Sequence, residues 1–188
     1  MEAYDPVFTH LGSGQIGGLT SRGIVPEFIP LPLLVAGGHV EIVESVLAQG
    51  GQEKTTLFEA VQNGRHDIVK LVTRHGADPN TVYVERTTLY TAASKGFIEI
   101  AELFLDNGAD VNHAFCFELT PLHAAIINNS VDMASLLLQR GADLEARDAH
   151  GRTPLSRSME RGMDMARLLI EKGVNINSED KQMNTPLH

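Results

Sequence analysis

The feature that most constrains this chain is a leucine that returns at a nearly constant interval. It stands at Leu57, Leu89, Leu122, Leu155 and Leu187, which are 32 or 33 residues apart. A glycine loop returns with the same period, at 76–78, 108–110, 141–143 and 173–175. Self-similarity at such a period predicts a solenoid, in which copies of one small unit stack on one another.

The unit is clearest at 120–143. Thr120 can cap a helix start by accepting a hydrogen bond from a backbone N–H, and Pro121 suits the first helical position, where its missing N–H would be unpaired. Apolar residues spaced i, i+3 and i+4 over 131–138 predict a second helix with one apolar face. Gly141 can adopt the left-handed conformation that ends this helix. A unit of about 33 residues cannot bury that face alone, so its stability requires neighbours.

The motif Thr-Pro-Leu-His at 120–123 returns at 185–188 and in part at 153–155, and it resembles the ankyrin repeat. The resemblance covers roughly residues 29–188. It implies an all-α solenoid of stacked helix-turn-helix units with short β-hairpin tips, with about five repeats and the start of a sixth. We expect repeats near 29–50, 55–80, 87–112, 120–145 and 153–177, and a partial repeat at 185–188.

Both ends of the chain depart from this pattern. Residues 1–28 fit no repeat, and their glycine-rich composition favours a flexible leader; the alternative is that Phe8, Ile16 and Leu19 cover the first repeat. The sequence stops four residues into a sixth repeat, which favours a piece of a longer array over a tail that folds back as a cap.

The start of the array is irregular as well. Pro32 in the first repeat predicts a shortened first helix. Thr55 follows Gly50 by five residues, whereas Thr120 follows Gly108 by twelve. We therefore expect the hairpin between the first two repeats to be largely missing.

Composition limits the class of partner. A net charge of −9 argues against a general binder of nucleic-acid phosphates, although it leaves room for a local basic patch. The sequence shows no secretory signal, and no stretch approaches the roughly 18 apolar residues of a membrane span. A single cysteine fits a reducing compartment. We expect an intracellular protein, cytoplasmic or nuclear, that binds neither nucleic acid nor membrane.

Catalytic and metal sites find little support. The chain has eight histidines, but no pair has the spacing of a zinc site, and one cysteine cannot build a thiolate cluster. Cys116 could meet His150 across adjacent tips, yet no orienting group or oxyanion site accompanies them. The family resemblance gives His123 a structural role, in hydrogen bonds between repeats. We expect no enzyme activity, no catalytic residue, no metal and no cofactor.

The resemblance places a concave binding surface at the hairpin tips and at the exposed ends of the first helices. The tip at 115–119 departs from the family pattern, because Phe115 stands where the two later tips have Asp148 and Asp180, and Glu118 stands where the next tip has Gly151. Exposed aromatic residues tend to mark interaction sites, although Phe115 and Phe117 could instead pack on each other and on Tyr83. The predicted partner-binding residues are Tyr83, Val84, Arg86, Lys95, Phe115, Cys116, Phe117, Leu119, Asn128, His150, Arg152 and Arg161.

The arginines and the lysine of this set leave two possibilities open. A positive stripe would suit an acidic peptide, since arginine offers forked hydrogen bonds to carboxylates. A scatter of solvated charges is the alternative.

The sequence thus predicts a monomeric, non-catalytic module that binds a partner protein or peptide. The alternative is a small-molecule-binding protein or enzyme with a pocket between the tips and the leader, or the interaction domain of a larger enzyme.

Overall fold

The computed structural model describes residues 31–50 and 53–186. The predictions about the leader at 1–28 and about the motif end at 187–188 therefore lie outside the described residues. Ten helices within this part of the chain form five antiparallel pairs. Their bounds are α2 Leu31–Ala36, α3 Val40–Ala48, α4 Glu53–Gln62, α5 His66–Arg74, α6 Thr88–Lys95, α7 Ile98–Asp106, α8 Pro121–Ile127, α9 Val131–Gln139, α10 Pro154–Ser158 and α11 Met163–Glu171.

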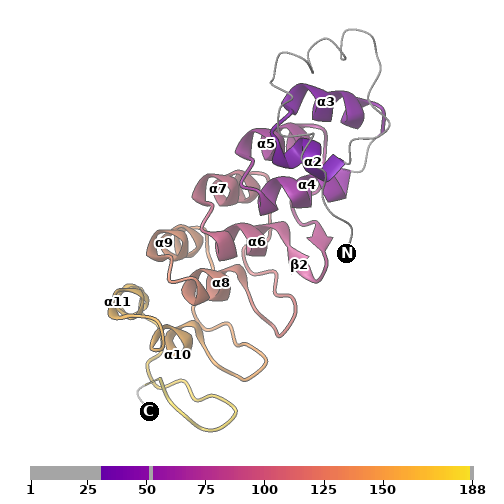
Figure 1. The fold of residues 1–188 in the computed structure, drawn as a ribbon. Coiled ribbons are helices and arrows are strands. Elements are labelled where there is room, and N and C mark those ends of the chain that lie inside the picture. Colours follow the sequence, from indigo (N-terminus) through magenta and orange to yellow (C-terminus); the bar gives the residue numbers. More distant parts are fainter. Residues whose placement is uncertain (1–30, 51–52, 187–188) are drawn as a thin grey trace, which may run out of the picture.

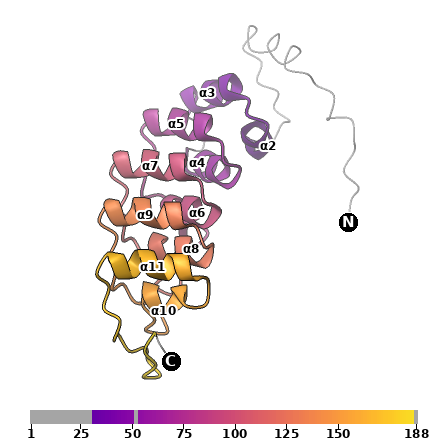
Figure 2. The same ribbon diagram turned by 90° about the vertical axis from the view of Figure 1, so that its left-hand side faces the viewer.

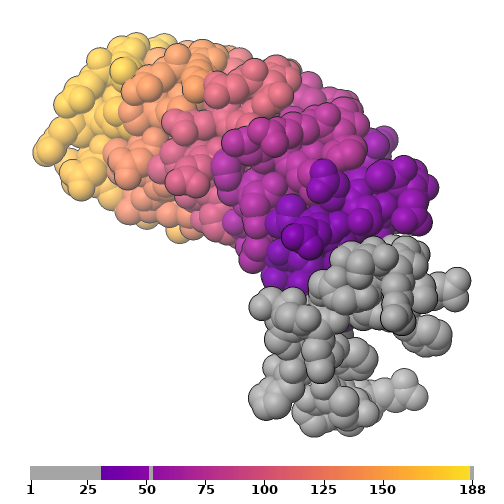
Figure 3. All heavy atoms as spheres, turned by 90° about the horizontal axis from the view of Figure 1, so that it is seen from above, coloured from indigo at the N-terminus to yellow at the C-terminus, as the bar shows by residue number. Residues whose placement is uncertain are grey.

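The pairs stack in chain order into an elongated body (Figure 3), and contacts between successive repeats arrange the helices in two layers. The first helices of the pairs, α2, α4, α6, α8 and α10, pack each on the next, and so do the second helices from α3 to α11. Figure 2 shows the second helices side by side, and Figure 1 shows the tips projecting away from them. The predicted all-α solenoid is confirmed.

The recurring leucine is the core residue of each first helix. Leu57, Leu89, Leu122 and Leu155 are all at most 2% exposed, so they form successive layers of one aliphatic core. Leu187 lies outside the described residues. The second helices add their apolar faces to the same core, as Phe104 does from α7 with no exposed surface. Each repeat therefore buries the face that its neighbour leaves open.

The helix starts follow the capping prediction. The side chains of Thr87, Thr120 and Thr153 accept hydrogen bonds from the backbone N–H groups three residues later. Pro121 and Pro154 open α8 and α10, where a proline lacks no needed donor. These caps fix where each tip joins its helix.

Helix lengths vary at both ends of the stack. The helix α2 has six residues and begins with Leu31 at the edge of the described residues, and α10 is shorter with five. Ser158 of α10 donates its hydroxyl to the Leu155 carbonyl, and such side-chain bonds compete with the helical pattern. Four residues separate the end of α3 from the start of α4, and two of them, 51 and 52, lie outside the described residues.

The tips are four successive loops, which we call the first tip (82–86), second tip (115–119), third tip (148–152) and fourth tip (180–184). The first contains the antiparallel strands β1, Val82–Tyr83, and β2, Arg86–Thr87, with Tyr83 opposite Arg86. The second has a single bridge between Phe115 and Leu119. Among the described residues, no helix is long and apolar enough to cross a membrane.

Candidate partner-binding site

A hollow of about 500 Å³ lies between the first and second tips, and we call it the tip hollow. Two helices supply its floor, with Phe58 and Gln62 from α4 and Tyr90 from α6. The two tips supply its walls, with Val84, Glu85, Arg86, Phe115, Cys116, Phe117 and Leu119. Six of the ten lining residues are aromatic or aliphatic, and Gln62, Glu85, Arg86 and Cys116 make the rest of the lining polar.

Both walls contain backbone conformations that glycine normally occupies. Val84 and Glu85 have φ of 44° and 59°, and Phe117 and Glu118 have φ of 61° and 58°. Val84 and Glu85 connect β1 to β2 as a two-residue turn, in which Asn-Gly is the favoured pair. Left-handed φ costs about 1–2 kcal/mol for each non-glycine residue. Strain of this kind clusters at functional sites, and here it is present on both walls of the tip hollow.

The strained turns leave two large apolar side chains in solvent. The exposed fractions are 73% for Val84 and 68% for Phe117. Tyr83 packs elsewhere, with its ring centroid 4.4 Å from that of Phe58 on α4. This pairing braces the first tip against the helix, whereas the sequence had suggested Tyr83 packing on Phe115 and Phe117. Tyr83 is not among the residues that line the tip hollow.

Backbone hydrogen bonds join the later tips but not the first two. The Ala149 N–H donates to the Phe117 carbonyl at 2.8 Å, and the Lys181 N–H donates to the His150 carbonyl at 3.1 Å. The equivalent bond between the first and second tips would run from the Cys116 N–H to the Val84 carbonyl. Within residues 31–50 and 53–186 that bond is absent. An unpaired donor and an unpaired acceptor therefore lie on the two walls of the tip hollow.

A side-chain contact between Cys116 and Glu85 joins the first two tips instead of this backbone bond. The Cys116 thiol donates to a Glu85 carboxylate oxygen, with Sγ and Oε2 3.7 Å apart. Partial desolvation and the neighbouring Glu85 carboxylate raise the pKa of the Cys116 thiol. A protonated thiol is a poor nucleophile, and no hydrogen bond joins Cys116 to His150 in the described part of the chain. The arrangement opposes the thiol chemistry that the sequence left open.

Of the two possibilities left open for these charges, a continuous positive stripe is the one that the structure interrupts. Arg152 is paired with Asp148 at 3.2 Å and with Glu160 at 3.7 Å, so its charge is neutralised. Lys95 ends α6 and Arg161 follows α10, both exposed. Arg86 lies with its guanidinium carbon 6.0 Å from the centroid of the Tyr90 ring, in the tip hollow.

The tip hollow brings together half of the predicted binding residues. Those that line it are Val84, Arg86, Phe115, Cys116, Phe117 and Leu119. Those that lie elsewhere are Tyr83, Lys95, Asn128, His150, Arg152 and Arg161. Sequence reasoning missed Phe58, Gln62, Glu85 and Tyr90, which also line it. The short spacing from Gly50 to Thr55 was the available signal, because it predicts that no hairpin covers α4 beside the first tip.

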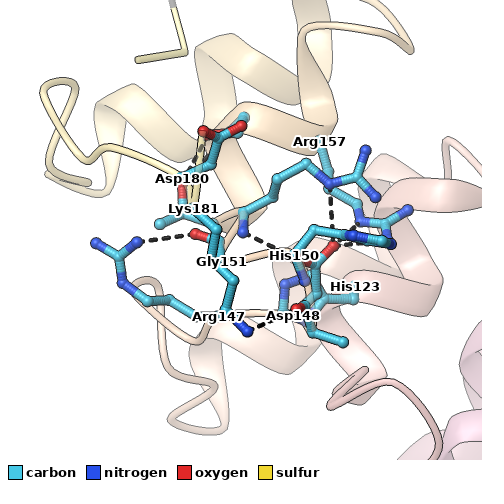
Figure 4. A network of polar contacts seen from close by, with 12 residues as sticks. His123, Arg147, Asp148, His150, Gly151, Arg157, Asp180 and Lys181 are labelled. Carbon is cyan, nitrogen blue, oxygen red and sulfur yellow. Dashed lines mark hydrogen bonds and ion pairs between the residues drawn. The ribbon is translucent and has the colours of Figure 1, made fainter. Parts of the chain in front are cut away.

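The third tip is built differently, around the buried carboxylate of Asp148 (Figure 4). The Arg157 Nη2 and Nε lie 2.6 and 2.8 Å from Asp148 Oδ2, and the backbone N–H groups of His150 and Arg152 donate to Oδ1. Burial raises the pKa of Asp148, but the hydrogen bonds from Arg152 and Arg157 outweigh it and hold the pKa below its usual value. This carboxylate holds its tip in place and faces no solvent.

His123 lies fully buried near this carboxylate. Its Nδ1 accepts a hydrogen bond from the Thr120 N–H at 3.2 Å, which places the proton of the neutral ring on Nε2. Nε2 has no hydrogen-bond partner of good geometry among the described residues, although an interaction with the Arg152 backbone of the next repeat is among the factors that raise the pKa of His123. Burial lowers the pKa of His123 to about 4, although Asp148 acts in the opposite direction.

Comparisons with known proteins agree with this architecture. A model of ankyrin repeats in three copies matches residues 81–148, and a model of the single ankyrin repeat matches 52–82 and 150–181. No curated protein matches the chain. Ankyrin repeats are generally protein–protein interaction modules and typically non-enzymatic. The matched residues span more than half of the chain, which therefore belongs to the ankyrin repeat family.

Proposed function

We propose that this chain is a non-catalytic interaction module that anchors a partner protein or peptide in the tip hollow. The observation that carries the proposal is a coincidence at one junction of the stack. An aromatic hollow, two exposed apolar side chains and an unpaired backbone donor and acceptor all lie between the first and second tips. The other two tip junctions have a backbone bond at the equivalent place.

The backbone groups suit an extended segment. A partner strand that lies between the tips can accept a hydrogen bond from the Cys116 N–H and donate one to the Val84 carbonyl. Main-chain bonds of this kind supply affinity in strand-addition complexes, while pockets for side chains supply specificity. Phe58, Tyr90 and Phe115 offer such a pocket directly beneath.

The strained turns favour the same interpretation. Asn-Gly at Val84 and Glu85 would relieve the left-handed strain, but it would also remove an exposed apolar side chain from the wall. The chain keeps the costlier residues at the place where a partner would touch them. Stability given up at a binding surface is a common compromise in proteins.

The predicted residues outside the hollow divide into two groups. Lys95, Asn128 and Arg161 occupy equivalent exposed places at the ends of α6, α8 and α10, and they extend the surface along the stack. His150 and Arg152 belong to the Asp148 arrangement and support the third tip.

The small-molecule alternative has weaker support. The tip hollow has a volume of about 500 Å³, which falls within the range of ligand pockets. However, Tyr83 and His150, which would line the pocket that this alternative requires, are not in it. The leader, its other wall, lies outside the described residues.

The test changes one apolar side chain on the hollow and one away from it. Phe117→Ser should weaken capture of the partner at least about tenfold, because a buried aromatic anchor contributes 2 kcal/mol or more. The matched control is Met183→Ser, since Met183 is also left-handed, with φ of 62°, and is 75% exposed on the fourth tip.

Partners would be identified by affinity capture with mass spectrometry and then titrated in purified form by surface plasmon resonance. Unchanged affinity of Phe117→Ser, or an equal loss with Met183→Ser, would reject the tip hollow as the anchor. Thermal melts of both variants should match that of the parent chain.

A further inference from the structure

We infer that the tip hollow selects an extended partner segment in which a bulky apolar side chain lies next to a single carboxylate. This inference rests on the proposed function, because it names the chemistry of the partner at the same site. Arg86 is the residue that carries it.

Arg86 is a cation without a carboxylate partner. In the part of the chain that the structure describes, the ion pairs involve Arg65, Arg140, Arg152, Arg157 and Arg167, and none involves Arg86. The carboxylate of the adjacent Glu85 contacts the Cys116 thiol instead. Arg86 therefore enters the hollow without a direct ion pair among the described residues, although the Glu85 carboxylate lines the same hollow.

The position of Arg86 suits a carboxylate. Its guanidinium lies over the Tyr90 ring, an attraction between a cation and an aromatic face that holds the planar group in place. A guanidinium held on one face still offers its N–H edges for two parallel hydrogen bonds to a carboxylate. A lysine ammonium at this place would lack that geometry.

The apolar lining supplies the second half of the preference. The floor and walls present Phe58, Phe115, Phe117 and Leu119 next to Arg86. Aromatic or leucine side chains gain most from such surroundings, because they lose the most contact with water there. A peptide that lies along the tips would place neighbouring side chains at the apolar lining and at the guanidinium.

The rim limits how acidic the partner can be. Glu118 is exposed on the second tip and Glu85 on the first, and the whole chain carries a net charge of −9. A run of acidic residues would meet these charges and be repelled. Attraction to Arg86 and repulsion by the surrounding negative charges together favour a partner segment that carries one carboxylate and binds in one register.

The experiment is selection of a display library of random twelve-residue peptides on the full chain, followed by fluorescence polarisation with the enriched peptides. Wild type should enrich peptides with an aromatic or leucine residue beside Asp or Glu. Changing that acid to its amide should weaken binding about tenfold. In Arg86→Gln the preference for the acid should disappear while the apolar preference remains, and Arg86→Lys should restore it in part.

The matched control is Arg74→Gln, which removes an exposed arginine at the end of α5, away from the tips, and should leave the acid preference intact. Enriched peptides that need Phe117 but show a neutral or basic neighbour would overturn this inference and leave the proposed function standing. Absence of enrichment, or binding indifferent to Phe117→Ser, would overturn both.

Discussion

Two junctions between neighbouring tips have the same architecture but treat their polar groups in opposite ways. One lies between the first and second tips, and the other lies between the second and third tips. At the later junction a backbone hydrogen bond joins Ala149 to Phe117, and Asp148 collects two arginines and two backbone donors. At the earlier junction the backbone bond is missing and a hollow takes its place.

The two junctions differ also in the residues that make the turns. The third tip has Gly151 with φ of 79°, whereas the second tip has Glu118 with φ of 58° at the equivalent place. One junction uses the residue that suits its backbone and satisfies its polar groups; the other retains strain and unpaired groups. If partners bind at the tip hollow, as proposed, stability and recognition are separated along the stack.

The largest expected effect follows removal of the charge at the later junction. Asp148→Asn should lower the free energy of unfolding by about 3–5 kcal/mol, because Arg152 and Arg157 are left without their buried partner. Urea denaturation would measure it. Asp180→Asn, at the equivalent place of the fourth tip, is the control and should cost less, since Asp180 bonds backbone N–H groups but no arginine side chain. Equal losses would refute the special role of Asp148.

A second effect concerns pH, again at the later junction. His123 has a pKa of about 4 in the folded chain and about 6.5 when unfolded, so below pH 6.5 the unfolded state binds a proton that the native state does not. Stability should therefore be complete above pH 6.5 and fall by roughly 3 kcal/mol towards pH 4. His123→Ser, which copies Ser156 of the next repeat, should flatten this slope in urea midpoints measured from pH 7 to 4.

Below about pH 4 the stability of the chain depends on a different titratable group, the carboxylate of Asp148. The pKa of Asp148 is held below its ordinary value, so its contribution is present above about pH 3.8 and is lost as the pH falls further. A slope between pH 6.5 and 4 that survives in His123→Ser would contradict the assignment to His123.

The smallest effect compares the same turn position in the two tips. Gly151→Ala should destabilise the chain by about 1–2 kcal/mol, because φ of 79° is unfavourable for alanine and the new Cβ would lie 2.9 Å from the Lys181 backbone nitrogen. Glu118→Gly should stabilise it by about 1 kcal/mol by relieving the same strain. Thermal or urea unfolding of both variants gives the signs. A loss of stability in Glu118→Gly would mean that the second tip is not strained.

The sequence predicted the repeated parts well, for a physical reason. Leu122 and Thr120 must satisfy the same packing and capping in every copy, so their positions follow from the period alone. Where one junction differs from the others, the period carries less information. Phe115 and Phe117 stood out as departures, but Phe58 and Tyr90 occupy ordinary helix positions, and their part in the hollow depends on how neighbouring repeats meet.

Two further features could not be predicted from the sequence, because they also depend on how neighbouring repeats meet. The neutralisation of Arg152 depends on Asp148 and Glu160, which the fold brings together. The missing bond between Cys116 and Val84 depends on backbone angles that no residue type dictates. Both are properties of contacts between units, which are set in three dimensions.

The absent tip-to-tip bond also has a mechanical consequence. The helical layers continue through this junction, since α6 packs on α8 and α7 on α9. Bending about these helices can move the first and second tips apart without breaking a backbone hydrogen bond between them, whereas the same bend at the next junction must break one. Bending between neighbouring tips is therefore less restrained at the hollow than at the two later junctions, and a partner segment that bridged its walls would restrain it.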